Sequence, residues 1–77
     1  MNAQWNFVEE NKGTYPFWEV VIDGRKVGIL VHRPDCYKLT IYTKGHHDYW
    51  SQDYETLPGA KDAFLHEYVA LRLEGKV

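Results

Sequence analysis

The sequence predicts an α+β fold, an antiparallel three- to four-stranded β-meander packed on one C-terminal α-helix in two layers. Three observations support this prediction. Runs rich in β-branched and aromatic residues follow one another between tight-turn signals. The last third of the chain has apolar residues at helical spacing between a capping threonine and a glycine. A length of 77 residues provides for one core, so we expect residues 1–77 to form a single small domain.

The first hairpin is predicted at Asp23-Gly24, because glycine accepts and aspartate tolerates the positive φ of a two-residue loop. This loop joins Phe17–Ile22 to Arg25–His32. A regular register from the loop gathers one set of side chains, with Ile29 at its centre, on the same face. We expect these side chains to form the sheet's half of the core: Trp18, Val20, Ile22, Val27, Ile29 and Val31.

The strand that follows is predicted at residues 36–43, after a loop at 33–35. Its inward residues, at the strand period of two, are Tyr37, Leu39 and Ile41. They reach the core face only if the loop has an odd number of residues, because a two-residue Pro34-Asp35 turn would direct Lys38 inward. Pro34 fits a loop here, since it has no N–H to give to a ladder.

Two edge strands complete the predicted sheet. One is expected at residues 46–54, after a turn at 44–45, and the sequence leaves two pairing registers possible for it. A two-residue loop there would turn inward Asp48 and Trp50, whereas a three-residue loop would turn inward Tyr49 and Ser51. The other is a short extra strand at residues 4–9, closed by a turn at 10–13.

The helix is marked at both ends. Thr56 is the expected N-cap, Pro58 lies in the first turn where its missing N–H costs nothing, and Gly75 stands where a left-handed residue ends a helix. At 100° per residue, one apolar stripe forms that would pack on the sheet: Leu57, Ala60, Phe64, Tyr68 and Leu71.

A second helical stripe consists of Leu65, Val69 and Leu73. One sheet face does not bury both stripes, and an exposed apolar strip of this kind usually marks a contact site. We therefore predict a homodimer through this stripe, because a two-fold axis lets the same strip meet itself. The alternative is that the amino-terminal segment folds back over it within one chain, with Trp5, Phe7 and Val8 as the cover.

Charge and cysteine content limit the partners. The net charge is −2, so the chain has no general basic field for nonspecific nucleic-acid binding. The lone Cys36 permits no internal disulfide, which favours the cytoplasm. No segment has the length and apolarity of a membrane span, so we expect no membrane contact.

Two residue groups have the side chains that a chemical site requires. His46, His47 and Asp48 invite a metal, but adjacent residues on a strand point to opposite faces, so we expect no metal site. Cys36 lies near His32 and Asp35 across the predicted loop, as a thiol, a base and a carboxylate. The sequence offers no phosphate-binding glycine loop beside them. We expect neither catalysis nor a cofactor.

Aromatic residues exceed what the core needs, since they make up 16% of the chain. The face opposite the helix is predicted to bind a partner through Phe17, Leu30, Lys38, Tyr42, Tyr49 and Trp50. The favoured function is a small stand-alone non-enzymatic module that binds a partner protein. In size and economy the chain is similar to accessory and inhibitor proteins of phages and other mobile elements. The alternative is a nucleic-acid-binding module in which the aromatic and basic sheet face stacks single-stranded bases.

Overall fold

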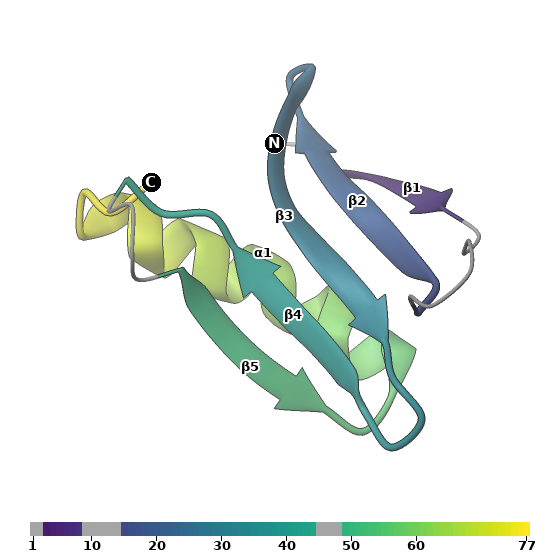
Figure 1. Ribbon diagram of the computed structural model, residues 1–77. Helices are drawn as coiled ribbons and strands as arrows, with labels where there is room; N and C mark the ends of the chain where they lie inside the picture. The colour runs from purple at the N-terminus through teal and green to yellow at the C-terminus, as the bar shows by residue number, and fades with distance from the viewer. Residues whose placement is uncertain (1–2, 9–14, 45–48) are drawn as a thin grey trace.

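A computed structural model describes residues 3–8, 15–44 and 49–77 of the chain. These residues form one antiparallel sheet with strands in sequence order, followed by one helix (Figure 1). The elements are β1 (Ala3–Val8), β2 (Phe17–Ile22), β3 (Arg25–His32), β4 (Tyr37–Ile41), β5 (Trp50–Tyr54) and α1 (Leu57–Leu73). The predicted two-layer α+β fold is confirmed. The sheet has five strands, because β1 and β5 both pair as edge strands.

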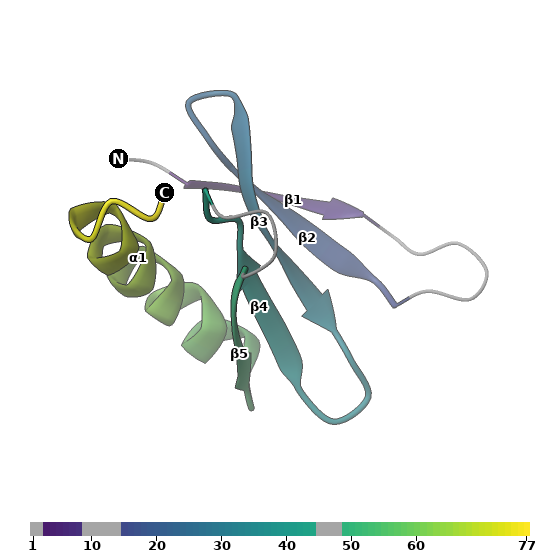
Figure 2. The ribbon, with the colours of Figure 1, turned by 60° about the vertical axis from the view of Figure 1, so that its left-hand side comes forward.

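The helix lies along one side of the twisted sheet and packs on β4 and β5 (Figures 1 and 2). We call the side of the sheet that faces the helix the inner face and the opposite side the outer face. The core between the layers consists of Val20, Ile22, Val27, Leu30, Leu39, Ile41, Ala60, Phe64, Tyr68 and Leu71. Within the described residues, no helix is long and apolar enough to cross a membrane.

The turn between β2 and β3 forms as predicted. Asp23 and Gly24 have φ values of 52° and 75°, and Ile22 pairs with Arg25. Two consecutive positive φ values match the twist of the flanking strands, which is why this turn type closes a two-residue hairpin.

Beyond the turn, a β-bulge shifts the register of β3 by one residue. Val21 pairs with Lys26 but Val20 pairs with Gly28, so Val27 is the extra residue. The predicted core face is therefore wrong beyond this point. Trp18 stands opposite Leu30, which is 0% exposed, whereas Ile29 and Val31 alternate onto the outer face.

The bulge also explains the wrong prediction for the loop between β3 and β4. His32 pairs with Tyr37, and the N–H of Arg33 donates to the carbonyl of Cys36 at 2.9 Å. The connection thus has an even number of residues, with Pro34-Asp35 at its tip. Because the bulge has already exchanged the faces of β3, an even loop returns Leu39 to the core opposite Leu30.

The last strand is shorter than predicted and starts at Trp50, which pairs with Ile41. This register turns Trp50 toward the inner face, where it packs against the core. The first part of the predicted strand, with His46, His47 and Asp48, lies outside the described residues, as does the turn predicted at 10–13.

The helix has the predicted ends. The hydroxyl of Thr56 accepts a hydrogen bond from the N–H of Gly59 at 3.1 Å, Pro58 lies in the first turn, and Gly75 has a φ of 76°. The predicted stripe is confirmed as the buried face of the helix, with Leu57 partly buried at its start.

Candidate binding surfaces

The outer face of the sheet carries a patch of apolar side chains that are half-buried, apart from the exposed Tyr49. Strand register aligns Val8, Phe17 and Val31 across β1, β2 and β3. Neighbouring positions on the same face extend this row, and the ring of Tyr42 lies 5.1 Å from the ring of Tyr49. We define the outer patch as Phe17, Val21, Ile29, Val31, Tyr42 and Tyr49. No other element of the described chain packs over this patch.

Charges on the outer face are balanced. Lys26 forms an ion pair with Glu19, and the hydrogen bond and charge of Glu19 raise the pKa of Lys26. The next cation, Lys38, stands opposite Asp53 in the β4–β5 register. Burial raises the pKa of the nearby Tyr42 hydroxyl, with Lys26 opposing this shift. The outer face is therefore aromatic and aliphatic, with one ion pair and one further lysine opposite a carboxylate, so these charges sum to no cationic excess.

Four of the residues predicted to bind a partner lie on this face: Phe17, Lys38, Tyr42 and Tyr49. The placement of Leu30 there is wrong, and for Trp50 the structure selects the register in which this residue points inward, one of the two that the sequence left open. Leu30 is in the core because of the bulge, and Trp50 packs on the inner side because it pairs with Ile41. Ile29 and Val31 take the place of Leu30 on the outer face.

A second aromatic cluster, not anticipated from the sequence, lies on the inner face beside the helix. The ring of Trp18 is 5.0 Å from that of Phe7 and 6.4 Å from that of Tyr37. His32 stacks on Tyr37 at 4.5 Å with an interplanar angle of 7°. These residues come from β1, β2, β3 and β4, so only the correct register brings them together. His32 thus contributes a ring to a packed cluster.

The group of Cys36, His32 and Asp35 is poorly suited to nucleophilic catalysis. Partial burial raises the pKa of the Cys36 thiol, and the carboxylates of Asp53 and Asp35 raise it further, against an opposing effect of Arg33. A nucleophilic cysteine needs the reverse, a lowered pKa that supplies thiolate. Among the described residues, no cluster of histidine, cysteine and carboxylate side chains could hold a metal.

The second helical stripe is exposed. Leu65, Val69 and Leu73 are 43%, 42% and 84% exposed. The predicted intramolecular cover does not form in the described chain: Trp5 packs edge-on against Phe64 of the buried stripe at 5.4 Å, with Lys61 over its ring.

The other two residues of the predicted cover also pack elsewhere. Phe7 lies against Trp18, and Val8 pairs with Phe17 in the β1–β2 register.

Comparison of the chain with family models, curated proteins and solved structures finds no significant match.

Proposed function

We propose that this protein is a small non-enzymatic binding module that occupies the surface of a partner protein with its outer patch. The observation that carries the proposal is a sheet face lined by half-buried aromatic and aliphatic side chains, on which no other described element packs. Aromatic side chains are enriched at protein interfaces, and a contiguous apolar patch on a small domain usually marks a contact site.

The charge arrangement favours a protein over a nucleic acid. A surface that binds phosphates gathers unpaired Lys and Arg beside its aromatic platform. On the outer face Lys26 is paired with Glu19, and Lys38 faces Asp53. The remaining described cations of the strand half lie elsewhere: Arg33 lies over the ring of Tyr15 in the loop region, and Arg25 and Lys44 line a hollow with Tyr68 of the helix.

The partner expected from this chemistry offers an apolar strip that lies along β2 and β3. Its rim carries one carboxylate and one cation, placed to meet Lys38 and Asp53. The lone Cys36 favours a cytoplasmic setting. An accessory or inhibitor role of the phage or mobile-element type fits a domain whose proposed activity is to cover a surface.

The test compares the native chain with Phe17→Ala/Tyr49→Ala, which removes two of the three aromatic rings of the outer patch and leaves Tyr42. A protein captured by the native chain from a lysate is purified, and its affinity for each variant is measured by calorimetry. Loss of two interface anchors should weaken binding by about 30-fold or more, since a hot-spot residue contributes about 2 kcal/mol. Circular dichroism checks that the double variant is folded.

The matched control is Leu65→Ala/Val69→Ala, which removes exposed apolar side chains from the helix and should leave partner affinity unchanged. An equal loss of affinity in both double variants would contradict the proposal. So would tight binding of single-stranded oligonucleotides that weakens steeply with salt and disappears in Phe17→Ala/Tyr49→Ala, which would assign the patch to nucleic acid.

A further inference from the structure

Two adjoining hollows lie where the turn at 23–24 meets the C-terminal end of α1. Both are lined by Arg25, Tyr68 and Val77. Lys44 also lines the first hollow, and Arg72 the second. Their volumes, about 230 and 340 Å³, lie at or below the small end of the range for ligand pockets. The hollows therefore suit a single small group.

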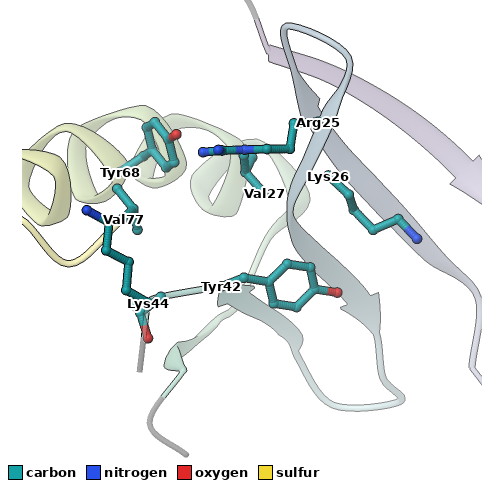
Figure 3. Close-up of a pocket in the computed structure, with 8 residues that line it drawn as sticks. Arg25, Lys26, Val27, Tyr42, Lys44, Tyr68 and Val77 are labelled. Carbon is teal, nitrogen blue, oxygen red and sulfur yellow. The ribbon is translucent and has the colours of Figure 1, made fainter. Parts of the chain in front are cut away.

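The cations around these hollows are unpaired. Within the described chain, Arg25, Lys44 and Arg72 form no ion pair. Lys26 also lines the first hollow, but it is paired with Glu19 and points away from it in Figure 3. Asp23 is the only acidic side chain that lines either hollow among the described residues. Three cations without an ion pair thus surround the space, against the Asp23 carboxylate in the second hollow and the terminal carboxyl group of Val77, which lines both.

A buried hydroxyl points into the same space. Tyr68 is 4% exposed, and its ring stacks on Phe64 at 5.5 Å. Its hydroxyl makes no hydrogen bond to another described residue. In Figure 3 this hydroxyl and the guanidinium of Arg25 point toward one another. An acceptor placed between these two donors would give the hydroxyl a hydrogen-bond partner within the protein–ligand complex.

The backbone positions the residues that carry two of the donors before any ligand binds. Arg25 follows the two-residue turn directly, so its position is fixed by the hairpin. The N–H of Lys44 donates to the carbonyl of Lys76 at 2.7 Å, and this hydrogen bond joins the segment after β4 to the segment after the helix. Lys44 extends toward Val77 from that point (Figure 3). Arg25, Lys44 and Tyr68, from three separate parts of the chain, therefore line one hollow.

We propose that this site, the Arg25–Lys44–Tyr68 pocket, binds a small doubly charged oxyanion, the phosphate of a monoester or inorganic phosphate. The guanidinium of Arg25 presents a planar fork for two oxygens, and Lys44 supplies a point charge. The hydroxyl of Tyr68 donates to a third oxygen. This assignment does not depend on the outer patch, so its test is independent of the test of the proposed function.

The experiment follows thermal unfolding and calorimetric binding of the full chain with sodium phosphate, against sodium chloride of equal ionic strength. Phosphate should raise the unfolding temperature by about 5 °C or more near saturation, because a ligand of the native state stabilises it by mass action. Arg25→Gln and Lys44→Gln should each weaken phosphate binding about tenfold or more. Lys38→Gln, which removes a cation from the outer face, should change nothing.

Tyr68→Phe separates a ligand contact from a structural one. It keeps the ring on Phe64, so the unfolding temperature without phosphate should stay unchanged or rise, while phosphate affinity falls about threefold or more. A lower unfolding temperature of Tyr68→Phe in phosphate-free buffer would show that the hydroxyl already has a structural partner, and would overturn the proposal.

Two sources of the phosphate are distinguished by comparing inorganic phosphate with phosphoserine. Tighter binding of inorganic phosphate assigns the pocket to the free ion, and tighter binding of phosphoserine assigns it to a phosphorylated side chain. An equal effect of chloride, or an equal loss in Lys38→Gln and Arg25→Gln, would overturn the site. A single-stranded oligonucleotide that binds more tightly than either probe and competes with phosphate would assign the pocket to a nucleic-acid backbone and also overturn it.

Discussion

Gly28 lets two neighbouring strands approach where any side chain would collide. A Cβ built on this residue would lie 2.5 Å from the carbonyl oxygen of Thr40 and 3.5 Å from the Cα of Ile41. Both atoms belong to the backbone of β4, so neither moves without moving the strand. Gly28 directly follows Val27, the extra residue of the bulge, and the two features together set how β3 meets β4.

Gly28→Ala should therefore destabilise the fold by about 1–3 kcal/mol, the cost of forcing extra volume into a packed interior. An alanine that fitted would instead stabilise slightly by restricting the unfolded chain. Urea denaturation of the two proteins gives the difference in the free energy of unfolding. An unchanged or higher midpoint for Gly28→Ala would mean that β3 and β4 do not approach this closely.

At the scale of the element, β3 shows what one extra residue does to a strand. Side chains on a strand alternate with a period of two, so a single inserted residue moves every later side chain to the other face. Leu30 becomes a core residue opposite Leu39, and Ile29 becomes part of the outer patch opposite Thr40. The same bulge accounts for the even loop at Pro34-Asp35.

The register can be tested by two alanine substitutions on β3. Leu30→Ala should destabilise by about 2–5 kcal/mol, because it leaves a cavity in a core that admits no water. Ile29→Ala should cost under about 1.5 kcal/mol, since this half-buried side chain is solvated on one side. Chemical denaturation measures both. A larger loss of stability for Ile29→Ala than for Leu30→Ala would contradict the bulge and favour the regular register.

Features with a local chemical cause were predictable from the sequence. The Asp23-Gly24 turn follows from positive φ, and the helix ends at Thr56 and Gly75 follow from capping. The bulge had only a weak local sign, a glycine inside a strand pattern at Gly28. Its position depends on how two strands and a helix fill one core, and periodicity within a single strand does not report that.

The same distinction divides the candidate surfaces. Phe17 and Tyr42 were placed on the correct face because β2 precedes the bulge and because β4 was oriented by its own core residues. Leu30 lies beyond the bulge and was misplaced. The pocket joins residues 25, 44 and 68, which come from a hairpin, a strand end and a helix. No motif or spacing links such positions, so the pocket could be found only from the structure.

At the scale of the whole molecule, one helix on one sheet leaves three separate surfaces. The outer patch lies on the side of the sheet opposite the helix, the Arg25–Lys44–Tyr68 pocket lies between the first hairpin and the end of the helix, and the second helical stripe is exposed. A partner on the outer patch would not cover the helix, because the sheet stands between them. Self-association through the helix and partner binding through the sheet are therefore compatible.

The second stripe gives the last prediction, a homodimer formed by Leu65, Val69 and Leu73 against the same residues of a second copy. The strip is apolar at i, i+4 and i+8, and two of its side chains are more than two-fifths exposed although they lie in the middle of the helix. A two-fold axis through the middle of the strip would set Val69 of one copy against Val69 of the other, and Leu65 against Leu73, in an antiparallel helix pair. Each copy would cover the other's strip.

Analytical ultracentrifugation at tens of micromolar should give about twice the chain mass, because dimerisation follows mass action with concentration. Leu65→Glu/Val69→Glu should return the protein to monomer with unchanged circular dichroism, since both side chains lie off the buried stripe. Gln4→Glu/Gln52→Glu adds the same charge at exposed positions of the edge strands and should leave the dimer intact. A monomer at every concentration, or dissociation of both double variants alike, would mean that the stripe does not pair with itself and that net charge alone controls association.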